Sequence, residues 1–173
     1  MALPDFFAEL EAARADGLIE RYAIGGAVGA TFYIEPSATQ DVDVFVVFNQ
    51  PSSRLVSLAP IYSYFTGRGA VVQDEHLVIA DWPVQFLPAT TPLVDDALAH
   101  AVSMRVDEQP VTVLSREHLA AIALETGRMK DKIRLAQFLA SETFDRARFD
   151  ALVERFGLTE KWMRFVVLME GEQ

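Results

Sequence analysis

The chain has 173 residues, of which 51% are hydrophobic and 23% are charged, a composition typical of one folded globular domain. It contains no cysteine, which excludes disulfides, thiolate metal sites and cysteine nucleophiles. The formal net charge of −10 disfavours binding to duplex DNA, although 11 of the 15 basic residues lie within positions 91–173.

The residues up to position 66 alternate between helical and strand patterns. Apolar residues with helical spacing predict helices, and the β-branched and aromatic run at 41–48 is the strongest strand signal of the chain. In chain order we expect a helix at 4–16, a strand at 23–24, a helix at 27–34, a strand at 41–48 and a helix at 53–66.

The remaining residues predict a β-meander followed by helices. In chain order we expect strands at 70–72, 76–80 and 84–87, a turn at 81–83, a helix at 93–101, a strand at 110–114 and helices from 116 onward. The pattern indicates an α/β (α+β) fold with a mixed sheet. Residues 1–115 form the expected α/β core, and residues 116–173 form a helical C-terminal extension packed on it within a single domain.

No segment of the sequence suggests a membrane or a secretion signal. Residues 1–17 lack a basic stretch followed by an apolar one, and no apolar run reaches 18 residues. We therefore expect a cytoplasmic protein with no membrane partner.

Asp41 and Asp43 form the first chemical motif. They are two residues apart on a predicted strand, so both side chains point to one face, with their Cβ atoms about 6–7 Å apart. Such carboxylates repel one another, and a divalent cation such as Mg²⁺, which also binds phosphates, relieves the repulsion. A pair of solvated aspartates at the start of a strand is the alternative.

Gly25 and Gly26 form the second motif, between a strand and a helix. Backbone N–H groups at such a turn can bind phosphate oxygens, although a tight connection alone would also explain the pair. A dinucleotide-binding fingerprint is disfavoured because the two acids precede the strand instead of ending it. Together, the glycine pair and the carboxylate pair indicate a site for a metal-bound phosphate ligand.

The histidines show no pattern of their own. His76, His100 and His118 are scattered and lack metal-ligand spacing, so we expect surface or helix-cap positions for them.

These motifs resemble the signature of the nucleotidyltransferase (DNA polymerase β-like) superfamily. The resemblance rests on Ile24-Gly25-Gly26 followed by Asp41-Val42-Asp43-Val44 and spans about residues 20–140. The stretch Gly127-Arg128-Met129-Lys130-Asp131-Lys132 resembles the R-x-K-D helix of small bacterial members, including the AbiEii-like toxin group and minimal nucleotidyltransferases. The resemblance implies that Asp41 and Asp43 are catalytic metal ligands and that Gly25 and Gly26 cradle phosphates.

The chain departs from that superfamily at the third carboxylate. The matching position lies in Val84-Gln85-Phe86 and holds Gln85, whose neutral amide cannot replace a carboxylate as metal ligand or proton acceptor. Three explanations stay open. One metal can suffice for activity, another acid such as Asp81 or Glu75 can substitute, or the protein binds nucleotide without transferring it.

Four cations lie close together on the first predicted helix after Gly127. Lys130 and Arg134 share one flank of the helix, and Arg128 and Lys132 share the other. We expect Met129, Ile133, Ala136 and Ala140 to form the buried stripe between them. If one flank faces the aspartates, Lys130 or Arg128 would bind the triphosphate; otherwise the cations are ordinary solvated side chains.

The sequence therefore predicts a Mg²⁺- or Mn²⁺-dependent nucleotidyltransferase that moves an NMP group from an NTP to a hydroxyl. The acceptor is a protein side chain, an RNA end or a small molecule. The alternative is a non-catalytic nucleotide-binding or partner-binding module of the same fold, related to toxin–antitoxin systems. The apolar residues after 145 suit a core, and Trp162 to Met169 could instead form a homo-oligomer contact.

Overall fold

The computed structural model describes residues 3–49, 57–74 and 76–171. The helices are α1 (Leu3–Ala15), α2 (Gly26–Ala30), α3 (Ala59–Gly67), α4 (Pro92–Ala99), α5 (Arg116–Thr126), α6 (Met129–Ala140), α7 (Arg146–Arg155) and α8 (Thr159–Gly171). The strands are β1 (Ile19–Ile24), β2 (Val42–Phe48), β3 (Val71–Gln73), β4 (His76–Ile79), β5 (Trp82–Pro88), β6 (Val102–Val106) and β7 (Gln109–Val113). The predicted α/β (α+β) class with a mixed sheet is confirmed.

The strands of the described residues form one seven-stranded sheet in the order β3-β4-β5-β2-β1-β7-β6. β2 runs antiparallel to β1 and parallel to β5, and β1 runs parallel to β7. The end of β1 and the starts of β2 and β5 therefore meet at the same edge of the sheet. This edge carries the residues singled out from the sequence.

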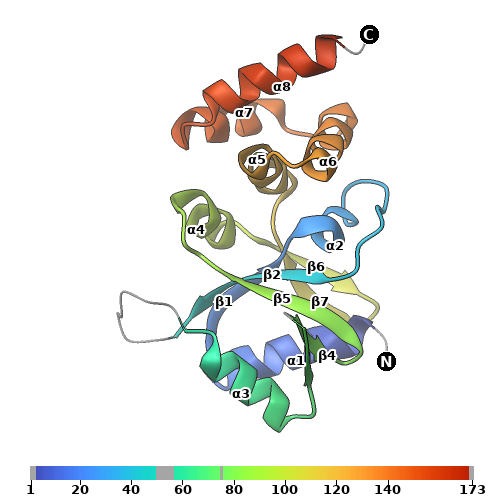
Figure 1. The fold of residues 1–173 in the computed structure, drawn as a ribbon, viewed down its shortest axis with the longest axis vertical. Helices are drawn as coiled ribbons and strands as arrows, with labels where there is room; N and C mark the ends of the chain where they lie inside the picture. Colours follow the sequence, from blue (N-terminus) through green and yellow to red (C-terminus); the bar gives the residue numbers. More distant parts are fainter. Residues whose placement is uncertain (1–2, 50–56, 75, 172–173) are drawn as a thin grey trace.

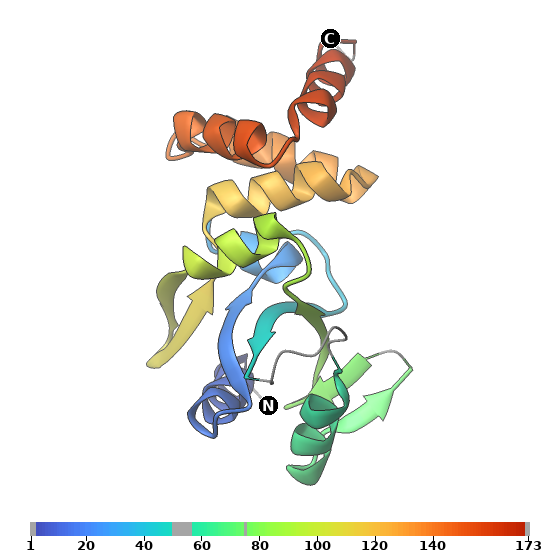
Figure 2. The same ribbon diagram turned by 90° about the vertical axis from the view of Figure 1, so that its left-hand side faces the viewer.

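Helices cover both faces of the sheet (Figure 1). α1 and α3 pack on one face, where Phe6, Phe65 and Val44 belong to one buried cluster. α2, α4 and α5 lie on the other face, α6 lies beside α5, and α7 and α8 stack beyond these helices (Figure 1 and Figure 2). The second buried cluster joins Phe45 of the sheet to Phe138 and Phe149 of the helical region. The C-terminal helices thus complete the core above the sheet.

Most predicted elements are present, with shifted ends. The helix expected at 27–34 ends at Ala30, and the meander turn lies at Ala80 and Asp81, both with positive φ, while Trp82 already belongs to β5. Residues 53–56 of another predicted helix lie outside the described residues. The sequence does not predict β6, because this strand at the edge of the sheet has no buried residue to create an apolar pattern.

None of the helices in the described ranges is long and apolar enough to span a membrane.

Candidate active site

The glycine turn and the carboxylate pair meet where β1 lies beside β2. Ile24 pairs with Val44, and the next backbone contact is the Gly25 N–H donating to the carbonyl oxygen of Asp43 at 2.9 Å. The Gly25 N–H is therefore engaged within the sheet edge and is not a free donor for a phosphate. A glycine is needed at position 25 for packing, because a Cβ there would lie 2.3 Å from the Phe45 ring.

Gly26 is the residue of the turn that lies against the Asp43 side chain. It has φ +56°, a conformation that favours glycine, and a Cβ there would lie 1.7 Å from Oδ2 of Asp43. The Asp43 carboxylate therefore lies against the backbone at the start of α2. In this position it faces the cavity that Gly26 also lines.

Asp41 and Asp43 both line this first cavity, which has a volume of about 330 Å³. Asp41 lies one residue before β2, where the hydroxyl of Thr39 donates to its Oδ1 at 3.1 Å. Burial raises the pKa of Asp43, and the neighbouring Asp41 raises it further, while Lys130, Arg134 and Arg128 lower it. A divalent cation between the two carboxylates would remove this mutual repulsion.

Gln85 lies at the position predicted for a third carboxylate. It is the register partner of Asp43 on β5, is exposed, and lines the first cavity. Of the two acids considered as substitutes, Asp81 is not among the residues lining this cavity or its larger neighbour, and Glu75 lies outside the described residues. Among the described residues of the first cavity, the amide of Gln85 therefore lies at the position next to the carboxylate pair.

The cations above the carboxylates come from α6 and its N-cap. Gly127 ends α5 with φ +69°, and Arg128 then caps α6, so the chain turns sharply above the sheet edge. Arg128, Lys130 and Arg134 line the first cavity, whereas Lys132 lines a separate one on the other side of the helix. The predicted flank of Lys130 and Arg134 therefore faces the aspartates, and Arg128 joins it from the cap.

A buried carboxylate orients two of these cations. Asp131 is 2% exposed and accepts hydrogen bonds from Arg128 Nε at 2.8 Å and Arg134 Nη1 at 3.2 Å. The hydrogen bond with Asp131 raises the pKa of Arg128, with smaller contributions from Asp131, Asp43 and Asp41 charges. Arg134 Nε is buried and has no hydrogen-bond partner among the described residues. These arginines are therefore held in place with donor capacity left for an anion.

The predicted buried stripe of α6 is wrong. Met129 is 69% exposed and Ile133 is 57% exposed, while Ala136 is half-buried and Ala140 is exposed. The buried residues are Asp131, Leu135 and Phe138. Their spacing is equally helical, but a buried aspartate held by two arginines does not count as apolar in a sequence pattern.

A larger cavity of about 730 Å³ adjoins the first and shares Asp41, Thr39, Lys130 and Arg134 with it. It adds His76 and Asp74 from β4 and the turn before it. His76 Nε2 lies 3.6 Å from Oδ2 of Asp41. The sequence predicts a surface position for His76, and its half-buried place beside Asp41 follows from the strand order, which no local pattern reveals.

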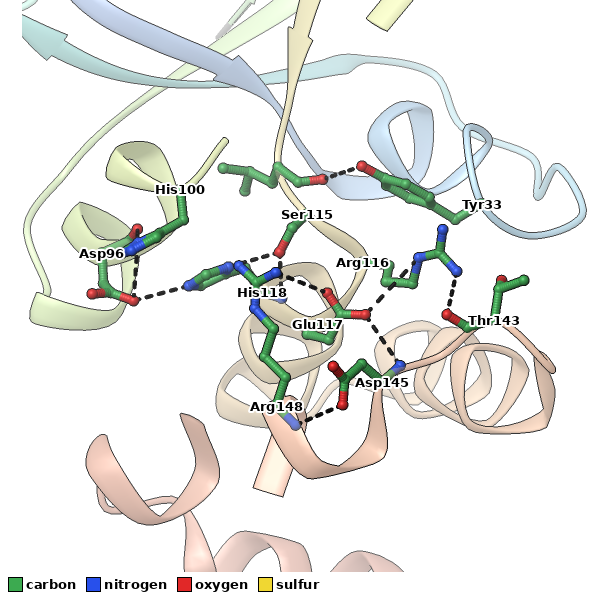
Figure 3. Close-up of polar contacts among 11 residues, drawn as sticks. Tyr33, Asp96, His100, Ser115, Arg116, Glu117, His118, Thr143, Asp145 and Arg148 are labelled. Atoms are coloured by element: carbon green, nitrogen blue, oxygen red, sulfur yellow. Dashed lines mark hydrogen bonds and ion pairs between the residues drawn. The ribbon is translucent and has the colours of Figure 1, made fainter. Parts of the chain in front are cut away.

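The other two histidines lie near helix ends, as expected, and the structure also brings them together. His118 does lie in the cap region of α5, but it is 1% exposed and stacks on His100 with ring centroids 5.8 Å apart (Figure 3). Asp96 of α4 contacts both rings. Packing of α4 on α5 brings together residues that are 18 positions apart in the sequence.

Comparison with solved structures shows the fold class. The chain is similar to ANT(2")-Ia in complex with adenylyl-2"-tobramycin, at 16% identity and a TM-score of 0.55, covering 88% of this chain and 95% of the other. It is similar to an antigenic nucleotidyltransferase-like protein from Paracoccidioides brasiliensis, at 14% identity and a TM-score of 0.56, covering 92% and 91%. No protein-family model and no curated protein matches the sequence. The chain has a nucleotidyltransferase-like fold.

Proposed function

We propose that the protein is a nucleotidyltransferase that uses Mg²⁺ or Mn²⁺ to move an NMP group from an NTP to a hydroxyl. The observation that carries the proposal is the first cavity. Asp41 and Asp43 lie on its sheet side. Three cations of α6 and its cap lie on the helix side, where the lining also includes Glu125 and Asp131, the latter paired with two of the cations. Metal-bound triphosphate is the ligand whose charges match both sides.

Each residue has a role in this proposal. Asp41 and Asp43 hold the divalent cation, which would neutralise phosphate charge and polarise the phosphate oxygens. Lys130 and Arg128 bind the triphosphate, and Arg134 adds a third cation. Gly26 contributes one backbone N–H donor at the start of α2, and Gly25 lets the turn pack against Phe45.

The reaction forms one bond and breaks another at the α-phosphorus. The acceptor oxygen bonds to the α-phosphorus, the bond to the bridging oxygen breaks, and pyrophosphate leaves with the electron pair of that bond. A base must accept the proton of the acceptor hydroxyl. With Gln85 in place of a carboxylate, the His76 imidazole beside Asp41 is the group that we assign to this step.

The larger cavity supports a small molecule as the acceptor. Its volume of about 730 Å³ is that of a small-molecule pocket, and it meets the first cavity at Asp41. The structure of ANT(2")-Ia holds adenylyl-2"-tobramycin, an adenylylated small molecule, in the same fold. The AbiEii-like subtype and the cytoplasmic location stay predictions, as does a homo-oligomer formed through exposed α8 residues such as Val167 and Leu168.

The test is transfer of label from α-³²P-labelled NTPs. Wild type, Asp43→Asn and Lys132→Ala proteins are incubated with each NTP, Mg²⁺ or Mn²⁺, and small-molecule, RNA and protein fractions of a cell lysate. We expect label on the small-molecule fraction with wild type and Lys132→Ala. Transfer by Asp43→Asn should fall by about 100-fold or more, the scale of losing one electrostatic contact in a transition state.

Two other outcomes have definite meanings. Equal labelling by Asp43→Asn and wild type would show that the site is assigned wrongly. Binding of Mg·NTP without transfer to any fraction would favour the non-catalytic binding module, in which Gln85 marks the loss of chemistry.

A further inference from the structure

A second polar cluster lies between α4 and α5 (Figure 3). Asp96 and His100 are four residues apart at the end of α4, and His118 is in the first turn of α5. Each offers one ligand atom, and these atoms lie within 4.8 Å of one another. The three residues are not among those lining the two cavities of the candidate active site, so the cluster is a separate feature.

The spacing of the ligand atoms suits a small metal ion. His118 Nε2 lies 3.0 Å from Oδ2 of Asp96, and His100 Nδ1 lies 3.6 Å from the same oxygen. Tetrahedral zinc, with metal–ligand bonds of about 2.0–2.2 Å, separates its ligand atoms by about 3.3–3.6 Å. The longer observed distance lies at the upper end of this range, and the shorter one is a hydrogen-bond contact between His118 and Asp96 that an ion would replace. Two imidazoles and one carboxylate suit zinc and its neighbours better than Mg²⁺, which prefers oxygen ligands.

The neighbours of the cluster orient two of the ligands. Ser115 Oγ lies 2.8 Å from Nδ1 of His118, so an Nδ1–H donating to this hydroxyl leaves the Nε2 lone pair directed at Asp96. Arg155 Nη1 lies 3.0 Å from Oδ1 of Asp96 and leaves Oδ2 for an ion. Metal-binding histidines commonly donate their second N–H in this way, which fixes ring orientation and tautomer.

His100 supplies the side of the cluster that is open to solvent. Its side chain is 53% exposed, and its Nδ1 lies 2.8 Å from the Asp96 carbonyl oxygen. To bind an ion through Nδ1, the ring must give up this contact with the carbonyl oxygen, turn toward Oδ2 of Asp96 and carry its proton on Nε2. A solvent molecule can then complete the coordination, because the His100 side chain is exposed.

We propose that Asp96, His100 and His118 form a binding site for a divalent transition metal of the zinc class. Such an ion would link α4, which packs on the sheet, to α5, which begins the helical extension. The site is independent of the nucleotide site. The ion is expected to stabilise the fold, because an ion that binds the folded chain and not the unfolded chain raises the free energy of unfolding.

The test titrates metal-free full-length protein with Co²⁺, followed by its visible absorption, and with Zn²⁺, followed by calorimetry. His100→Ala is the main variant because His100 is exposed, whereas the buried His118 could be needed for folding. Asp43→Asn is the matched control, since it alters the candidate active site and leaves the cluster intact. Circular dichroism verifies that both variants fold.

We expect wild type and Asp43→Asn to bind Co²⁺ with the intense bands of a tetrahedral site and to unfold at a higher temperature with Zn²⁺. His100→Ala should lose both effects, with affinity reduced by about tenfold or more. The proposal is overturned if no ion binds, if His100→Ala binds as wild type does, or if Asp43→Asn removes the binding. None of these results depends on nucleotide transfer.

Discussion

Gly26 shows at the scale of a single residue how the backbone and the site constrain each other. Its φ of +56° favours glycine, and the space where a Cβ would lie is occupied by the Asp43 carboxylate. The glycine therefore allows the Asp43 carboxylate, which we propose as a metal ligand, to lie against the backbone turn. The turn and the carboxylate act as one unit, although 16 residues separate them in the sequence.

Gly26→Ala is predicted to weaken Mg·NTP binding by about tenfold or more, because the new methyl group displaces a charged ligand of the site. Gly17→Ala is the matched control, since Gly17 also has positive φ but has nothing within 4 Å of the position that a methyl group would take. Both variants should lose about 1–2 kcal/mol of stability from backbone strain. Wild-type nucleotide affinity in Gly26→Ala, measured by calorimetry, would contradict the assigned contact.

Site residues that are close together in the sequence could be predicted. Contacts that depend on strand pairing or helix packing could not. Asp41, Asp43 and Gly26 stand in short motifs whose spacing sets their geometry. His76 reaches Asp41 because β4 joins the sheet beside β5, which is a property of the strand order. His100 and His118 meet through the packing of α4 on α5, which no local pattern in the sequence reveals. The sequence predicts that the Gly25 N–H donates a hydrogen bond to a phosphate, yet in the structure it donates to the backbone carbonyl oxygen of Asp43.

At the scale of elements, α6 connects the candidate site to the helical region. One side carries Lys130 and Arg134 above the carboxylates, and the buried side carries Leu135 and Phe138. The buried cluster that includes these two residues also includes Phe45 of the sheet. We infer that residues 1–115 and 116–173 fold as one cooperative domain.

Leu135→Ala is predicted to lower the free energy of unfolding by about 2–5 kcal/mol, because it leaves a cavity in the shared core. Met129→Ala on the same helix is the control, since Met129 is 69% exposed, and its cost should stay within about 0.5 kcal/mol. Scanning calorimetry should show a single transition for wild type and both variants. Two transitions, of which Leu135→Ala shifts one, would show that the parts unfold separately.

At the scale of the whole molecule, charge is distributed in a way that suits the proposed function. The chain carries a net charge of −10, yet four of its 15 basic residues lie within positions 128–134, and three of these line the cavity above the acidic sheet edge. A free triphosphate is repelled by the acidic surface, whereas a metal-bound triphosphate finds charges of both signs in one cavity. The sequence revealed the cluster of cations, and the packing of α6 decided which of them reach the site.

The most direct measurement is calorimetric titration of the protein with a Mg²⁺-bound NTP analogue that cannot be cleaved at the α-phosphate. It requires no acceptor, so it tests the site itself. We predict that Asp43→Asn and Lys130→Ala each weaken binding by about tenfold or more, about 1.4 kcal/mol, while Lys132→Ala binds as wild type does. Equal affinity of wild type and Asp43→Asn would contradict the assignment of the carboxylate pair as the metal-nucleotide site.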